Sequence, residues 1–113
     1  MVHAALRHTD LRVLRGVLGI SQEMLARVLD VSSRSVERWE AGAVPTDQRV
    51  LRLIDRIDEV ATLGLEVYGD GLATYMRMPR RALGGRSPAA ALVAGEFDGV
   101  MGLLAQAAEA QFA

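Results

Sequence analysis

The sequence predicts an all-α fold, and three observations support this prediction. Apolar residues recur at helical spacing in each long segment of the chain. Residues that cap helix starts precede these segments, and glycines follow them. No segment of weight alternates apolar and polar residues as a half-buried strand does. The 113 residues, half of them hydrophobic, suit one compact domain, or one and a half small ones.

The first two helices are expected near the N-terminus, separated by a short connection. Thr9 can cap the first helix, and Gly19 is its expected stop. Ser21 can cap the second helix, which runs through about Leu29, because its hydroxyl can accept an otherwise unpaired amide. The apolar face of the first helix is formed by Leu11, Leu14, Val17 and Leu18, and that of the second by Met24, Leu25, Val28 and Leu29.

A third helix follows a short polar turn at residues 30–32. Either Ser32 or Ser33 can cap it, and Gly42 is its expected end, since glycine adopts a left-handed cap at little cost. An exposed helix start that is rich in Ser and Arg suits phosphate oxygens and base edges. The side chains expected to face inward are Val36 and Trp39.

The longest helix is expected after a linker at residues 43–45, with Thr46 as its cap and its end near Val67. Its apolar residues occupy several faces, which predicts packing on two sides. One side is expected to meet the first three helices, and the other the rear half or a second copy of the chain. These apolar residues are Val50, Leu51, Leu53, Ile54, Ile57, Val60, Ala61 and Leu65.

Four shorter elements are expected in the rear half, after the Gly69-Asp70-Gly71 break. Pro79 ends the first of them, because residues before proline disfavour the helical region. Ser87 followed by Pro88 is a strong helix start. The elements are a helix over 72–78, a turn over 79–85, a helix over 88–93 and a last helix over 97–110.

The composition narrows the possible functions. There is no cysteine, and all 13 basic residues are arginine, so thiol chemistry and lysine chemistry are excluded. We find no catalytic constellation, no metal site and no cofactor motif, and we therefore expect a protein that is not an enzyme. No apolar run of about 18 residues and no signal peptide is present, which predicts a cytoplasmic protein without a membrane span.

The charge is unevenly distributed along the chain. Residues 1–56 carry 9 Arg and 7 acidic residues, for a net charge of +2. Residues 57–113 carry 4 Arg and 7 acidic residues, for −3, which together give the overall −1. A mildly basic front half and an acidic rear half suit a protein with two kinds of partner.

The segment 20–42, ISQEMLARVLDVSSRSVERWEAG, resembles the Xre-type, phage-repressor-like helix-turn-helix. The matching residues are Ser21, Gln22, Leu25, Ala26, Leu29, Val31, Ser32, Ser35, Val36, Arg38, Trp39, Glu40, Gly42 and Pro45. The resemblance implies that residues 1–45 bind double-stranded operator DNA, although two helices joined by a turn more often serve packing alone. The expected DNA contacts are Gln22, Ser32, Ser33, Arg34, Ser35, Glu37 and Arg38.

The rear half, from about Leu51, resembles the toxin-binding domain of Xre/MbcA/ParS-type antitoxins. The matching residues are Tyr75, Met76, Pro79, Leu83, Gly84, Gly85, Ser87, Pro88, Leu92, Gly95, Glu96, Val100, Leu103, Leu104, Phe112 and Ala113. Three positions depart from the family pattern: Tyr75 replaces a usual Trp, Arg80 a usual Asn, and Gln111 a common Gly. This resemblance implies a toxin-binding region over residues 46–113.

Together the two resemblances imply the antitoxin of a type II toxin–antitoxin pair. The partner would be a RES-domain toxin that depletes NAD, and the chain would form a homodimer and a toxin–antitoxin hetero-oligomer that represses its own operon. One alternative is a stand-alone Xre-like repressor without a toxin, and another is a scaffold that has lost DNA binding. The expected toxin contacts are Arg77, Arg80, Arg81, Leu83, Arg86, Phe112 and Ala113.

The C-terminal tail has two interpretations. In the first, Phe112 and Ala113 enter the NAD cleft of the toxin, and the arginine-bearing loop docks on the rim of that cleft. In the second, Phe112 packs on Val100 and Leu104 of its own chain, and the arginines form a solvated strip. The position of Phe112 in the fold distinguishes the two.

Overall fold

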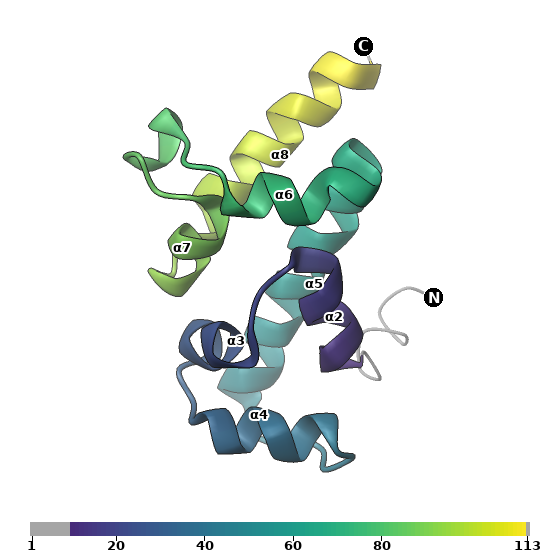
Figure 1. The fold of residues 1–113 in the computed structure, drawn as a ribbon, viewed down its shortest axis with the longest axis vertical. Coiled ribbons are helices and arrows are strands. Elements are labelled where there is room, and N and C mark those ends of the chain that lie inside the picture. Colours follow the sequence, from purple (N-terminus) through teal and green to yellow (C-terminus); the bar gives the residue numbers. More distant parts are fainter. Residues whose placement is uncertain (1–9, 113) are drawn as a thin grey trace.

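The computed structural model describes residues 10–112, and all regular elements in that range are helical, which confirms the all-α prediction (Figure 1). The front half contains α2 (Leu11–Leu18), α3 (Gln22–Leu29) and α4 (Ser33–Glu40). The central helix is α5 (Gln48–Tyr68). The rear half contains η1 (Gly69–Gly71), α6 (Leu72–Arg77), η2 (Arg81–Leu83), α7 (Pro88–Val93) and α8 (Phe97–Phe112).

The helix boundaries lie close to those predicted, but two caps differ. Asp10 caps α2, and Thr9 lies outside the described residues. Asp47, not Thr46, caps α5. In both helices the aspartate accepts a hydrogen bond of 2.8 Å from the amide two residues further on. A carboxylate adds a full negative charge at the positive end of the helix dipole, which favours Asp over the neighbouring Thr.

The two helices of the helix-turn-helix start as predicted, and the second ends earlier. Ser21 caps α3, and Ser32, not Ser33, caps α4. Helix α4 ends at Glu40 rather than Gly42, which nevertheless adopts a positive φ of 123° immediately after the helix. The left-handed turn predicted at Gly42 is therefore present, but it follows the helix end instead of forming it.

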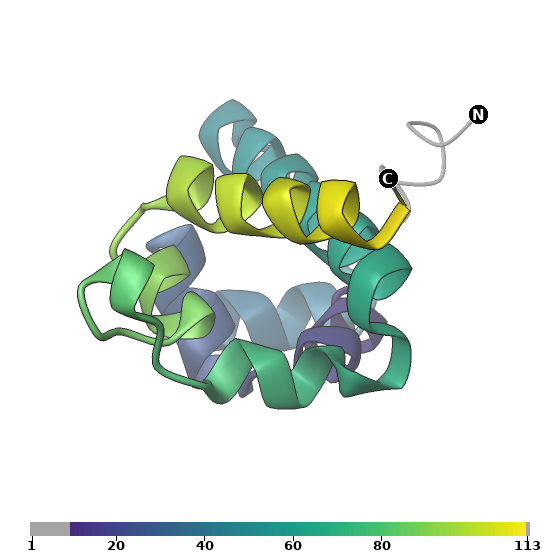
Figure 2. The same ribbon diagram turned by 90° about the horizontal axis from the view of Figure 1, so that it is seen from above.

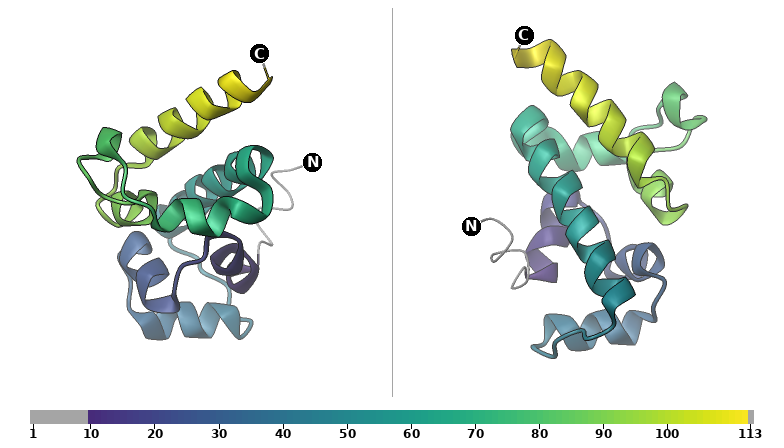
Figure 3. Two further views of the ribbon diagram at one scale, coloured as in Figure 1. Left: turned by 45° about the horizontal axis from the view of Figure 1, so that its top comes forward. Right: turned by 180° about the vertical axis from the view of Figure 1, so that it is seen from behind.

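Helix α5 is the centre of the molecule and packs on two sides, as predicted. It contacts α2 and α3 of the front half, and α6 and α8 of the rear half (Figure 3). Packing within the chain therefore occupies most of its apolar surface, and only Leu65 remains largely exposed, at 44%. Its buried residues are Val50, Ile54, Ile57, Val60, Ala61 and Gly64.

Direct contacts also join the front and rear halves. Helix α2 packs against α6, and α3 packs against α7. At the end of α2, Gly19 has a φ of 68°, and a Cβ added there would lie 2.6 Å from the Cβ of Ala73. Glycine is therefore required at this position both for backbone conformation and for close approach. The buried residues of the two halves form one continuous cluster.

Helix α8 ends the described chain and extends away from the rest of the rear half. It continues through Phe112, two residues beyond the predicted end. Its 16 residues span about 24 Å, and its last turns lie far from α7 (Figure 2).

No single helix within 10–112 is long and apolar enough to cross a membrane. The segments Arg81–Val93 and Phe97–Phe112 meet that test only together, and a bend of 115° separates them.

Candidate functional site

Helix α4 forms the outer layer at one end of the molecule (Figure 1). Val36 is completely buried beneath it, whereas Trp39 is only partly buried against the core and not enclosed as expected. Within residues 10–112, neither Arg34 nor Arg38 forms an ion pair. The exposed side chains of this face are Ser33, Arg34, Glu37 and Arg38.

Two serines at the start of α4 form hydrogen bonds within the helix. The Ser32 hydroxyl accepts a hydrogen bond of 3.1 Å from the Ser35 amide, and the two hydroxyl oxygens lie 3.1 Å apart. The first turn of a helix presents amides without helical partners, which favours anions. The start of α4 thus combines an anion-favouring helix end with Arg34, and Arg38 lies one turn further along the helix. Neither arginine pairs with an acid within residues 10–112, and the arrangement suits a phosphate backbone.

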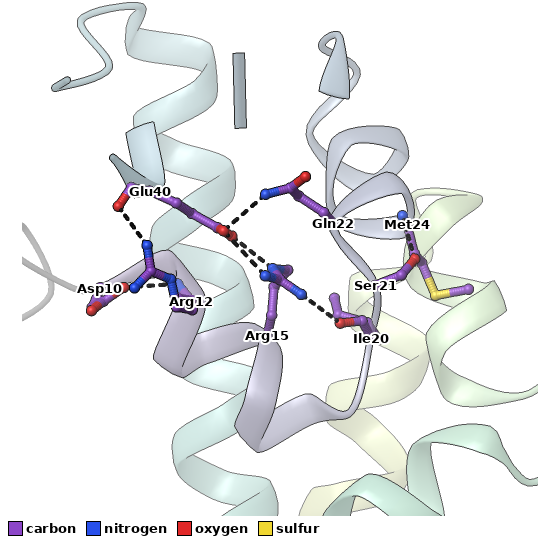
Figure 4. Close-up of polar contacts among 8 residues, drawn as sticks. All are labelled: Asp10, Arg12, Arg15, Ile20, Ser21, Gln22, Met24 and Glu40. Atoms are coloured by element: carbon purple, nitrogen blue, oxygen red, sulfur yellow. Dashed lines mark hydrogen bonds and ion pairs between the residues drawn. The ribbon is translucent and has the colours of Figure 1, made fainter. Parts of the chain in front are cut away.

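A partly buried ion pair at Glu40 fixes the other end of α4 (Figure 4). Arg15 donates from Nε to Oε2 of Glu40 at 2.6 Å and from Nη2 to Oε1 at 3.1 Å. Gln22 donates from Nε2 to the same Oε1 at 3.0 Å, and Arg12 donates to the Glu40 carbonyl at 3.1 Å. The Glu40 side chain is only 4% exposed. One carboxylate therefore links α2, the start of α3 and the end of α4.

The environment of Glu40 stabilises its charged form. The hydrogen bond from Arg15 lowers the pKa of Glu40, the hydrogen bond from Gln22 adds to this effect, and burial opposes it. The same hydrogen bond raises the pKa of Arg15. A Gln amide carries two N–H donors, and Gln22 uses one of them for Glu40. The second donor remains compatible with the phosphate contact expected for this residue.

We expect Glu40→Gln to lower the free energy of unfolding at pH 7 by about 1–3 kcal/mol, because Arg15 loses its charged partner in a largely buried position. The folded-state pKa of Glu40 is depressed. Its contribution is thus fully present above the unfolded value of about 4.3 and is lost as pH falls through the lower folded value. Urea unfolding at several pH values measures the difference, which should shrink in acid.

The matched control for this experiment is Glu59→Gln, which makes the same change at an exposed position of α5. Its effect should stay within about 0.5 kcal/mol at every pH. Equal stability of Glu40→Gln and the wild type at pH 7 would contradict the stabilising role of the ion pair.

The loop between α6 and α7 carries the arginines expected at the toxin surface. Arg77 and Arg81 are exposed, and neither pairs with an acid in the described part of the chain. Arg86 forms an ion pair with Glu96 and donates from Nε to the Leu83 carbonyl at 3.2 Å. Leu83 requires a correction, because it is only 5% exposed and packs in the core, where it offers no surface to a partner.

Arg80 differs from the other arginines of the loop, because its guanidinium lies over the ring of Tyr75, 4.6 Å from the ring centroid. Tyr75 in turn stacks on Tyr68, with centroids 4.3 Å apart and planes inclined by 20°. Burial raises the pKa of Tyr75, the neighbouring Tyr68 adds to this, and Arg80 opposes it. Sequence reasoning identified Arg80 as an expected toxin contact and both Tyr75 and Arg80 as departures from the family pattern, but it did not predict that the two side chains meet.

The end of α8 presents Phe112 to solvent. Phe112 is 65% exposed, whereas Val100 and Leu104 are completely buried. Because the helix is continuous, Phe112 lies eight residues and about 12 Å beyond Leu104, so packing on these two residues is ruled out. Ala113 lies outside the described residues.

The structure does not bring the arginine loop and Phe112 together. Leu83 of η2 packs on the first turn of α8, where a Cβ added to Gly99 would lie 3.4 Å from its side chain. Phe112 follows thirteen residues later, about 20 Å along the helix (Figure 2). A partner that touches both must cover a face of this width, as a standard protein interface of about 800 Å² per side does.

Known proteins match the helix-turn-helix region and also the chain as a whole. A family model described as a helix-turn-helix domain matches residues 9–60. The mycobacterial cidal antitoxin MbcA of Mycobacterium tuberculosis and that of Mycobacterium bovis are each 34% identical to this chain over 96 residues, 84% of this chain and 85% of the relative.

A structural comparison finds the same relationship. The crystal structure of the M. tuberculosis MbcT–MbcA toxin–antitoxin complex contains a chain that matches with a TM-score of 0.69 and 34% identity. The match covers 92% of the present chain and 95% of the other. It therefore includes both the helix-turn-helix and the helices of the rear half.

Proposed function

Since this chain belongs to the family of the MbcA antitoxins, we propose that it neutralises a toxin and represses the operon that encodes both. The observation that carries this proposal is the match over nearly the whole chain to a protein whose solved structure is a toxin–antitoxin complex. The family is one of antitoxins with a helix-turn-helix and not one of enzymes.

Operator binding is assigned to residues 1–45. The support is the exposed face of α4, where Arg34 and Arg38 have no acidic partner among the described residues. Arginine binds guanine through two hydrogen bonds in the major groove, and serines and helix amides bind phosphates. The Glu40 network supports this role, because it fixes both ends of the helix-turn-helix relative to α2.

Toxin binding is assigned to residues 46–113, with Phe112, Ala113 and the arginine loop as contacts. The support is the large exposed aromatic side chain at the end of α8 and the exposed cations of the loop. Helix α4 and the end of α8 lie at opposite ends of the molecule (Figure 1). This placement allows DNA and toxin to bind the same chain at the same time.

The toxin is assigned to the RES class, which depletes NAD in the cytoplasm, on the basis of the family resemblance of the rear half. Co-expression of the tagged chain with the product of the neighbouring gene, followed by a pull-down, tests the proposal. We expect the two proteins to copurify and the cellular NAD level to recover on co-expression. Operator binding without any copurifying partner would favour the stand-alone repressor instead.

We further propose that the chain acts on DNA as a homodimer. A single helix-turn-helix makes few contacts, and a net charge of −1 adds little non-specific attraction. Two copies on half-sites about 34 Å apart would combine their contacts. Light scattering on the isolated chain and on its DNA complex measures the mass. A strict monomer at tens of micromolar in both states would contradict this.

A further inference from the structure

The backbone of Arg80 is held by hydrogen bonds within the loop between α6 and α7. Its amide donates to the Arg86 carbonyl at 3.0 Å. Its carbonyl accepts hydrogen bonds from the amides of Leu83, at 3.0 Å, and Gly85, at 2.9 Å. Three backbone hydrogen bonds therefore hold the position from which this side chain leaves the loop.

The side chain of Arg80 is also held in place. The guanidinium carbon lies 4.6 Å from the centroid of the Tyr75 ring, which is itself 5% exposed and stacked on Tyr68. A cation over an aromatic ring is stabilised by the ring quadrupole. A guanidinium carries five N–H donors, more than contact with one tyrosine can use, so donors remain for a planar acceptor.

The other arginines of the loop are less suited to a specific contact. Arg86 is already paired with Glu96. Arg77 and Arg81 are exposed, without an ion pair or a ring beneath them in the residues that the structure describes. Ordering such a side chain on binding costs conformational entropy, most of which Arg80 has already lost because its side chain is held over Tyr75 in the free chain.

The charge of the rear half points to the chemistry of the partner. Residues 57–113 carry a net charge of −3 and so lack the broad positive surface that a polyanion such as a nucleic acid requires, whereas a single carboxylate needs only one local cation. A preorganised guanidinium fork matches a carboxylate through two parallel hydrogen bonds. An acidic side chain on a protein surface is therefore the acceptor that this arrangement fits.

We propose that Arg80 is the specificity-determining cation of the toxin-binding surface, where it binds a carboxylate of the toxin, and that Tyr75 and Tyr68 are its positioning residues. The inference rests on the proposed toxin-binding function. It also accounts for two of the three departures from the family pattern, Tyr75 and Arg80, as one unit, because the two side chains are in contact. A toxin that pairs with this chain would carry the matching acid.

The test measures the affinity of the full chain for the purified product of the neighbouring gene by titration calorimetry. Arg80→Met removes the charge and keeps the apolar stem, and we expect it to weaken binding at least thirtyfold, the level of an interface hot spot. Arg80→Lys keeps the charge without the planar fork, and we expect an intermediate loss of about three- to tenfold. Tyr75→Leu removes the ring beneath Arg80 and should weaken binding about two- to tenfold, and Tyr75→Phe, which restores the ring, should recover the affinity. Equal affinity of Tyr75→Leu and the wild type would overturn the positioning role of Tyr75.

Three further measurements separate this role from a structural one. The affinity of the wild type should fall more steeply with salt than that of Arg80→Met, because one charge pair is missing in the variant. Melting temperature and operator binding of Arg80→Met should match the wild type. The matched control, Arg27→Met, removes an exposed arginine from α3 in the front half and should leave toxin affinity unchanged.

The outcomes distinguish the inference from the function on which it rests. A wild-type chain that does not bind the toxin overturns the proposed function. A wild-type chain that binds, together with Arg80→Met within twofold of it, overturns only the role of Arg80. An equal loss in Arg27→Met shows a general charge effect and also overturns it. An equal loss of operator affinity in Arg80→Met would assign the residue to a phosphate instead.

Discussion

Arg34→Ala is expected to weaken binding to the operator by roughly five- to 150-fold while leaving thermal unfolding unchanged. The side chain is exposed at the start of α4 and forms no ion pair within residues 10–112. Its removal therefore breaks no ion pair that stabilises the fold. An arginine that reads guanine through two hydrogen bonds contributes about 1–3 kcal/mol of discrimination, which corresponds to this range of affinity.

Fluorescence anisotropy with labelled promoter DNA of the chain's own operon measures this effect. Arg38→Ala, one turn further along the same face, should show a loss of the same order. Arg52→Ala removes an equal charge from an exposed position of α5 and reports the general electrostatic loss, which should stay below about threefold. Wild-type affinity in both α4 variants would show that this face does not contact the operator.

The sequence predicts the helices of this fold well because the signals that determine them are local. Ser21 and Ser87 cap their helices as expected, and the left-handed glycines Gly19 and Gly84 follow theirs. Each of these features depends on residues within one turn of the chain. The prediction of Thr46 as the cap of α5 was wrong, because the adjacent Asp47 can also cap the helix and local sequence ranks two such neighbours only weakly.

The contacts that position the candidate site are less predictable, because they join residues far apart in the sequence. Glu40 and Arg15 are separated by 25 residues, and their pairing depends on how α2 and α4 cross. The stack of Tyr75 with Tyr68 likewise depends on the turn at η1. Leu83 was assigned to the surface from a family pattern, which records that a residue recurs but not which way its side chain faces.

Deletion of residues 111–113 is expected to leave folding and operator binding intact and to abolish neutralisation of the toxin. Phe112 is 65% exposed at the end of α8, so the fold loses little apolar burial when it is removed. An exposed aromatic side chain at a helix end fits an apolar cleft. Loss of such an anchor weakens the binding free energy by about 2 kcal/mol or more, which corresponds to at least about thirtyfold in affinity.

Growth of cells that co-express the toxin measures neutralisation, and calorimetry with the purified toxin measures affinity. Phe112→Ala should reproduce most of the defect, because it removes the aromatic side chain and keeps the neighbouring residues. Gln111→Ala is the matched control, since it changes an exposed neighbour in the same last turn and should rescue growth as the wild type does. If the truncated chain rescues cells as well as the full chain, the tail does not occupy the cleft of the toxin, and only the contacts proposed for the arginine loop would remain.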